Sequence, residues 1–340
     1  LLKITICVLG LTVVDLAWAE VMGALIYILI LIYFFRKEPF TFPSKIFIKN
    51  YTNFALPIFL IGLIGTLVYN IDKLMIGFFL DSTHVGYYSL SERLINPLLA
   101  LSVIISSLFF VSVNKLYNEN KMELITDNTL KAERYLVLLT LPILVTIILY
   151  STEILSIFGE DTLHSVFTLQ ILGICLFTMS LNNLYTVQIT ATGHLKEALW
   201  ISLFVILVLI SMNIVFIPNN IWGYNMMGMG IDGAAIATLI GLIVRGILSR
   251  IATYRIIGTP FSKSNITFAI SALITFVLMY NFLNIYDFNI YHKIMIVPFI
   301  TLFFLCITYL MGEFGKDDIN FFRDILNLKK LGNSMREELE

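Results

Sequence analysis

The sequence has little charge, and that shortage excludes several classes of protein. Only 13% of its 340 residues are charged, whereas 58% are hydrophobic and 27 are Phe, a balance that soluble globular domains do not reach. The formal net charge of −1 provides no basic surface, so we expect no nucleic-acid partner. Apolar runs of about 20 residues, long enough to cross a hydrocarbon core, recur along the chain. The sequence therefore predicts an all-α polytopic membrane protein.

Cysteine and histidine are also scarce, and their positions predict no disulfide framework and no metal site. The three cysteines lie far apart inside apolar runs, and the four histidines are isolated near expected loops. We expect no catalytic residues and no cofactor, apart from a coupling ion, H⁺ or Na⁺. The residues concerned are Cys7, Cys175, Cys306, His84, His164, His194 and His292.

About ten transmembrane helices are expected. Residues 1–35 imitate a signal peptide, but the chain stays apolar to Phe35, so we interpret them as the tail end of one helix, a break near Asp15 and a span over 17–35. The remaining spans are expected at 53–80, 87–112, 133–152, 165–189, 197–217, 229–252, 267–285 and 292–311.

The connections between spans alternate in charge. One set holds most of the 22 basic residues, in the segments 36–49, 115–134, 250–263 and 316–336, and the opposite set is acidic, as at Asp81. By the positive-inside rule, the basic connections and the C-terminus are cytoplasmic, and the turn at Asp81 is outside.

Four charges interrupt two neighbouring spans on either side of a short polar turn, Asp81 to Gly86. Asp72 and Lys73 precede this turn, and Glu92 and Arg93 follow it. Antiparallel helices would bring both pairs to a similar depth, roughly 9 to 13 Å below the turn at about 1.5 Å per residue. Since an ionisable side chain near the bilayer centre costs about 2.5 to 3.5 kcal/mol, these four should face protein or water.

Helical spacing extends this cluster into two polar stripes, which predict a wet cleft between the helices. Tyr69 shares a face with Asp72, and Asn96 shares a face with Arg93. The alternative interpretation is that the charges neutralise one another and only fix helix packing. Arg245, which is expected nearer the cytoplasmic side of the membrane, either lines a cavity or extends to the inner headgroups. Tyr88 either stacks on sugar or belongs with Tyr87 to an aromatic belt.

A short pattern is repeated in the two halves of the chain. Asp15 to Gly23 and Asp232 to Gly241 are each followed by an apolar span and then by Pro-Phe. One copy alone is a helix-packing motif. Repetition indicates duplicated lobes with a transport site between them.

Several phrases in order resemble one family. The run ALPIFLIGLIGTLVYNIDKLMIGFFLDSTHVGYYSLSERL, then ILSIFGEDTLHSVFTLQILG, ITATGHLKEALW and NIVFIPNN followed by GIDGAAIAT, is similar to the polysaccharide-export flippases of the multidrug/oligosaccharidyl-lipid/polysaccharide exporter superfamily. The resemblance implies a partial first lobe, a complete second six-helix lobe and two extra C-terminal helices. It assigns 1–49 to the end of the N-terminal lobe and the inter-lobe connection, 50–260 to the C-terminal lobe, 261–315 to the additional pair and 316–340 to a cytoplasmic tail. About four N-terminal helices of the family are missing, as expected for a fragment or a truncated reading frame.

The resemblance also implies a function. It is translocation of a polyprenyl-diphosphate-linked oligosaccharide across the cytoplasmic membrane for surface polysaccharide biosynthesis, by alternating access of a cationic cavity. The partners implied are that lipid-linked oligosaccharide, membrane lipids, and a glycan polymerase and glycosyltransferases of the same pathway. The substrate-binding candidates are Lys73, Arg93, Asp72, Glu92, Tyr69, Asn96 and Arg245.

Two other functions stay open. A cation-coupled multidrug antiporter of the same superfamily would use Asp72 or Glu92 to carry H⁺ or Na⁺. A membrane-embedded glycan polymerase or transferase ranks lowest, because such an enzyme needs a large outer loop or a cluster of catalytic acids.

Overall fold

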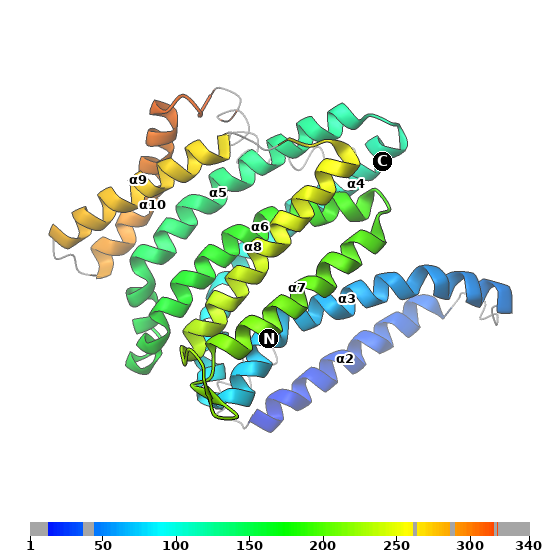
Figure 1. The fold of residues 1–340 in the computed structure, drawn as a ribbon, viewed down its shortest axis with the longest axis horizontal. Helices are drawn as coiled ribbons and strands as arrows, with labels where there is room; N and C mark the ends of the chain where they lie inside the picture. Colours follow the sequence, from blue (N-terminus) through cyan, green and yellow to red (C-terminus); the bar gives the residue numbers. More distant parts are fainter. Residues whose placement is uncertain (1–12, 37–43, 261–263, 286–289, 316–317, 319–340) are drawn as a thin grey trace. The chain divides into compact units, whose positions relative to one another are not determined.

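A computed structural model describes residues 13–36, 44–260, 264–285, 290–315 and 318. Within these ranges the chain is almost entirely helical, with one short 3₁₀ helix and one two-stranded hairpin (Figure 1). The elements are α2 (Val13–Phe35), α3 (Lys45–Phe79), α4 (Ser82–Asn118), α5 (Met122–Ser156), η1 (Glu160–Ser165), α6 (Val166–Ala191), α7 (Leu195–Phe216), β1 (Asn220–Ile221), β2 (Tyr224–Asn225), α8 (Gly230–Ile257), α9 (Ser264–Ile285) and α10 (Ile290–Leu310).

The nine helices α2 to α10 coincide with nine of the ten expected spans. The tenth, partial span falls among residues 1–12, outside the described ranges, as does most of the expected tail, 316–340. Seven stretches of the described residues are long and apolar enough to cross a membrane, and Val21–Phe35 and Ile296–Leu310 are shorter apolar helices. The prediction of an all-α polytopic membrane protein is confirmed.

Two predicted breaks are wrong in detail. Asp15 lies in the first turn of α2, so the break expected there does not occur within the described residues. The polar turn is also shorter than Asp81 to Gly86, because α4 begins at Ser82. Asp81 has an extended backbone and accepts a hydrogen bond from the backbone N–H of His84, 2.9 Å away. This N-cap satisfies a free donor of the first turn and lets the helix start early.

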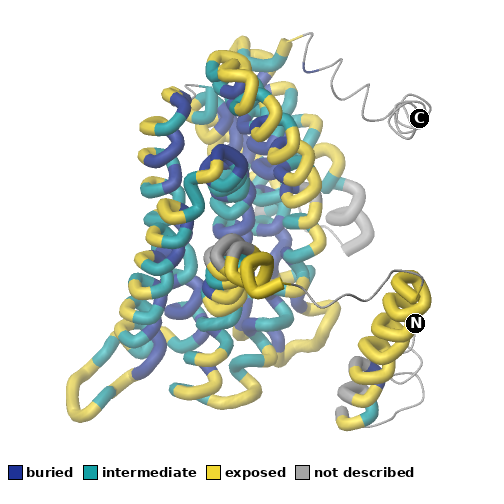
Figure 2. Tube along the Cα trace, turned by 90° about the vertical axis from the view of Figure 1, so that its right-hand side faces the viewer, coloured by how far each residue is buried: buried dark blue, intermediate teal, exposed yellow. Residues whose placement is uncertain are grey.

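The chain divides into two compact units, Leu1–Phe54 and Ala55–Glu340. The first contains α2 and the beginning of α3. Nearly every described side chain of α2 is exposed (Figure 2), and most of them are apolar, so its surface is suited to hydrocarbon rather than water.

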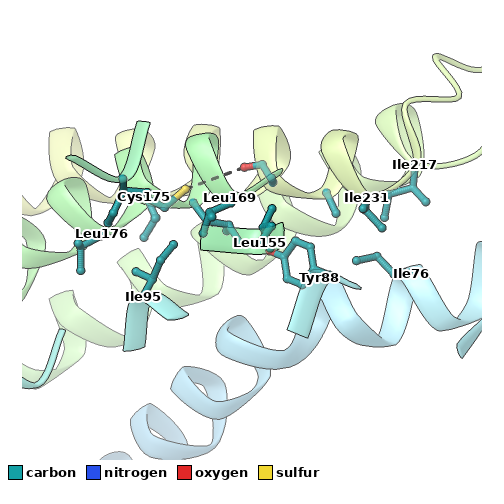
Figure 3. Close-up of a cluster of buried hydrophobic side chains, with 14 residues drawn as sticks. Ile76, Tyr88, Ile95, Leu155, Leu169, Cys175, Leu176, Ile217 and Ile231 are labelled. Atoms are coloured by element: carbon teal, nitrogen blue, oxygen red, sulfur yellow. Dashed lines mark hydrogen bonds between the residues drawn. The ribbon is translucent and has the colours of Figure 1, made fainter. Parts of the chain in front are cut away.

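The second unit is built around α6. This helix packs against α4, α5 and α8, and α8 packs in turn against α7. The main apolar cluster joins Ile76 of α3, Tyr88 and Ile95 of α4, and Leu169 and Leu176 of α6 (Figure 3). These helices enclose the candidate site.

Small residues bring α7 and α8 unusually close, as the repeated motif predicts. A Cβ added at Gly233 would lie 2.6 Å from the carbonyl oxygen of Phe216, and one at Gly241 would lie 2.5 Å from a methyl carbon of Leu209. The Phe216 oxygen belongs to the backbone and cannot move aside, so glycine is required at Gly233, whereas a Cβ at Gly241 would force the Leu209 side chain to shift.

The helices α9 and α10 pack on α5 through a second apolar cluster that includes Phe268 and Phe304. A charged clamp closes one end of this contact. Arg134 of α5 donates to both carboxylate oxygens of Asp318, at 2.9 and 2.7 Å, and to the side chain and backbone carbonyl of Glu313. The segment after α10 is thereby fixed to α5.

Candidate functional site

A cavity of about 130 Å³, partly open at exposed Gly65 and Tyr69, lies inside the second unit. We call this cavity the chamber. Five helices contribute to its wall: α3, α4, α6, α7 and α8. Most of the lining is apolar, and the polar lining residues are Tyr69, Asp72, Tyr88, Glu92, Asn96, Thr238 and Arg245.

Asp72 is the central group of the chamber, because its buried carboxylate is held only by neutral donors. It is 4% exposed. Asn213 donates to one oxygen at 2.8 Å, and Thr238 and Tyr88 donate to the other at 2.6 and 3.3 Å. Within the described residues no basic side chain contacts it. A buried carboxylate without a countercharge is expensive unless it binds a proton or a cation.

Two of these donors were not found from the sequence. Asn213 and Thr238 lie 141 and 166 residues beyond Asp72, so no local spacing relates them to it. The signal available was a polar side chain inside an apolar span, which in a membrane helix points inward. One of the two roles predicted for Tyr88, membership of an aromatic belt, is wrong. Tyr88 is 2% exposed and bonded to Asp72, so it is not part of such a belt.

Lys73 and Glu92 meet directly between α3 and α4. The ammonium group lies 2.8 Å from the Glu92 carboxylate and 4.6 Å from the centre of the Tyr69 ring. Asn96 donates to the Tyr69 hydroxyl at 2.7 Å. Glu92, Tyr69 and Asn96 line the chamber, whereas Lys73 is not among the lining residues. Lys73 is therefore already neutralised.

Arg93 does not join this cluster. The chamber face of α4 is made by Tyr88, Glu92, Ile95, Asn96 and Leu99. One residue further along a helix turns by about 100°, so Arg93 points away from that face. Its side chain is exposed, and no hydrogen bond or ion pair holds it within the described part of the chain. The expectation that Arg93 and Asn96 share one polar stripe into the cleft is wrong.

Arg245 lines the far end of the chamber and also a small adjoining void. It lies seven residues after Thr238 on α8, roughly 10.5 Å along the helix axis at about 1.5 Å per residue. No hydrogen bond or ion pair to Arg245 occurs among the described residues. The chamber wall thus carries the carboxylate of Asp72 beside Thr238 and, about two helical turns further along α8, the guanidinium of Arg245.

A second cavity, which we call the α8–α9 groove, is much larger and mostly apolar. It measures about 790 Å³ and is bordered by α5, α6, α8 and α9, with Ile243, Ile247, Ile270 and Leu273 among its lining. Its polar end is a buried network that the sequence did not suggest. Tyr185 donates to Glu133 at 2.7 Å, Arg250 donates to Glu133 at 3.3 Å, and Asn265 also donates to this carboxylate.

The fold and the chamber define a polytopic α-helical membrane protein that encloses charged groups between its spans, where ionisable side chains are candidates for a functional site. Residues 1–166 match the sequence profile of a family described as Polysaccharide biosynthesis protein. The fold is similar to that of a solved structure described as Lipid II flippase MurJ in an inward closed conformation, with a TM-score of 0.63 and 19% identity. These findings confirm the resemblance to the polysaccharide and lipid-linked oligosaccharide exporters.

The structural match covers 80% of this chain and 57% of the flippase chain. The present chain therefore spans little more than half the length of that relative. No curated protein sequence matches the chain.

Proposed function

We propose that this chain is part of a flippase that moves a polyprenyl-diphosphate-linked oligosaccharide across the cytoplasmic membrane. The observation that carries the proposal is Arg93, an exposed guanidinium in the middle of a membrane-spanning helix with no partner in the described part of the chain. Since a cation facing acyl chains is costly, this face of α4 borders water or further protein. A guanidinium there offers two parallel donors to a phosphate.

The size of the chamber supports a substrate route outside it. Drug-sized ligand pockets measure about 300 to 1,000 Å³, whereas the chamber holds only about 130 Å³. An oligosaccharide does not fit, but a hydrated ion does. We therefore assign the substrate route to the exposed face of α3 and α4, which carries Gly62, Gly65, Tyr69 and Arg93, and the chamber to the coupling ion.

The apolar part of the substrate needs a separate surface, and the α8–α9 groove has a suitable volume and lining for a polyprenyl chain. Its polar end lies beside the basic connection that the positive-inside rule places in the cytoplasm. This orientation also puts the C-terminus in the cytoplasm. A glycan polymerase and glycosyltransferases of the same pathway are the partners such an exporter would serve.

The second candidate function is a cation-coupled antiporter for organic molecules. Asp72 favours it, because a buried carboxylate with only neutral donors is suited to carry H⁺ or Na⁺. Both functions use the same ion, and they differ in the cargo.

Reconstitution of the protein in liposomes distinguishes the two. We expect movement of a fluorescent lipid-linked oligosaccharide between leaflets, driven by an ion gradient, and no efflux of a cationic dye. Dye efflux without glycolipid movement would identify the antiporter and contradict the flippase.

Arg93 gives this experiment its matched variants. Arg93→Ala should abolish glycolipid movement, because the phosphate loses its cation, and Arg93→Lys should recover part of it, since a lysine keeps the charge but not the paired donors. Insertion in the membrane should be unchanged in both. Full transport by the alanine variant would remove Arg93 from the route.

A further inference from the structure

The connection between α7 and α8, residues 218–229, contains a hairpin that is held by backbone hydrogen bonds and yet exposes most of its side chains. Asn220 pairs with Asn225 and Ile221 with Tyr224, leaving Trp222 and Gly223 as a two-residue turn. The return strand is tied to the end of α7 by backbone bonds such as Met227 N–H to Val215 O at 3.0 Å and Gly230 N–H to Ile217 O at 3.1 Å. The hairpin is visible at the ends of α7 and α8 in Figure 1.

The turn places tryptophan in a conformation that tryptophan disfavours. Both turn residues have positive φ, 50° at Trp222 and 87° at Gly223, as a primed hairpin turn requires. Asn, Asp and Gly normally occupy such positions, and a bulky side chain there is an outlier. Trp222 is nevertheless 96% exposed, so it gains nothing from packing within the chain. A strained and exposed aromatic indicates a contact outside the chain.

The chemistry of the hairpin indicates what that contact is. No residue from Ala198 to Ile231 carries a charge. The hairpin itself combines Trp222 and Tyr224, both largely exposed, with exposed Met227 and the amides of Asn220 and Asn225. A hairpin exposed to bulk water would be expected to carry charged side chains. A hairpin buried in the hydrocarbon core would be expected to lack the side-chain amides of Asn220 and Asn225. Tryptophan and tyrosine with uncharged polar groups are typical of the bilayer interface.

Other exposed apolar side chains lie at the same end of the second unit. Tyr87 of α4 and His164 of η1 have ring centres 6.4 Å apart, and Thr168 of α6 donates to Asp232 of α8 at 2.6 Å. These contacts show that the connections α3–α4, α5–α6 and α7–α8 share one end. This end also displays Phe78, Ile157 and Phe158, which are 80%, 69% and 52% exposed.

We propose that the hairpin of residues 218–229 is an interfacial anchor, inserted among the lipid headgroups of the leaflet at this end, with Trp222 and Tyr224 in contact with lipid. The anchor fixes the depth of α7 and α8, the two helices that supply Asn213 and Thr238 to Asp72. This inference is independent of the cargo that the protein carries.

Depth-dependent fluorescence quenching tests the proposal on the intact chain. The chain has three tryptophans, so the double variant Trp18→Phe, Trp200→Phe leaves Trp222 as the single emitter. In phosphatidylcholine and phosphatidylglycerol liposomes we expect emission at shorter wavelength than free N-acetyltryptophanamide. Lipids brominated near the headgroup should quench it more strongly than lipids brominated at the end of the acyl chain.

The matched control is Trp18→Phe, Trp222→Phe, which leaves Trp200, an exposed residue within α7. Its emission should be quenched by bromines placed deeper. The proposal is overturned if Trp222 is quenched by acrylamide as strongly as the free compound and not by brominated lipid. It is also overturned if Trp222 responds only to added oligosaccharide or to a protein partner.

A second measurement covers the case in which the tryptophan variants fold poorly. Trp222→Cys in a chain without its three native cysteines, labelled with a nitroxide, should be more accessible to oxygen and less accessible to a water-soluble nickel complex than a label at Asn118→Cys. Asn118 lies between Lys115 and Glu119 at the opposite end of α4. Equal accessibility at both sites would contradict insertion.

Discussion

At the scale of single residues, the chamber is defined by a carboxylate whose hydrogen bonds come from three other helices. Tyr88, Asn213 and Thr238 each give Asp72 a neutral donor. The carboxylate is thus solvated without being neutralised, and a proton or a small cation can still neutralise it. This arrangement differs from that of Glu92, whose charge Lys73 already balances.

Asp72→Asn tests this role. The amide keeps the shape of the side chain but carries no charge, so transport should continue, if at all, without dependence on an ion gradient. Glu92→Gln provides the comparison, since it removes a charge that is already paired. Ion-dependent flux in liposomes measures the difference, and unchanged ion dependence in Asp72→Asn would remove this residue from coupling.

Arg245 should weaken cation binding at Asp72 through the chamber. At a separation of roughly 10 Å and an effective dielectric constant of about 20, the repulsion between a bound cation and the guanidinium is about 1.7 kcal/mol. Removing about 1.7 kcal/mol of repulsion corresponds to about 17-fold in affinity, so Arg245→Gln should raise the apparent affinity for the coupling ion by about that factor, measured as the ion concentration at half-maximal transport. A loss of glycolipid binding with unchanged ion affinity would instead assign Arg245 to the phosphate.

At the scale of helices, the contact between α7 and α8 is the most sensitive to side-chain volume. Gly241→Ala should lower stability by about 1 to 3 kcal/mol, the usual cost of overpacking, because its Cβ would overlap Leu209. Gly62→Ala is the matched control, since no atom lies within 4 Å of its added Cβ. Unfolding in detergent measures both, and Leu209→Ala in the Gly241→Ala background should restore part of the loss.

The positions of the helices could be predicted from the sequence more completely than the directions of their side chains. Apolar run length determines the spans, which is why nine expected helices match α2 to α10. The direction in which a side chain points is harder to predict, because neighbouring positions on a helix point about 100° apart. Glu92, for example, lines the chamber and Arg93 does not. The partners of Asp72 could not be predicted at all, since α7 and α8 meet α3 only through tertiary packing. The roles of the seven candidate residues in substrate binding stay predictions.

At the scale of the whole molecule, the clamp between Arg134 and Asp318 holds the segment after α10 against α5. Burial tends to raise the pKa of Asp318, but hydrogen bonds from Arg134 and from the Gly315 N–H outweigh it, so the pKa is lowered overall. The folded pKa then lies below the unfolded value of about 3.9. The stabilisation is present above the unfolded value and is lost as the pH falls through the folded one.

Asp318→Asn should therefore lower the thermal unfolding midpoint near pH 7, and the difference from the unaltered chain should shrink as the pH falls below about 4. Asp127→Asn is the matched control, because Asp127 forms an exposed pair with Lys131, and such surface pairs contribute little. A deficit for Asp318→Asn that persists unchanged at low pH would show that packing, rather than charge, accounts for the effect.

The sulfur of Cys175 forms part of the chamber wall and is buried, whereas Cys306 is exposed. The reactivity of a thiol in that position depends on whether the chamber is open to solvent. In a chain with Cys7 and Cys306 replaced by serine, a small charged alkylating reagent reaches the remaining sulfur only during the moments when the helices part. The alkylation rate, measured with and without Na⁺ or at different pH, then reports how often the chamber opens. This measurement does not require the cargo to be known.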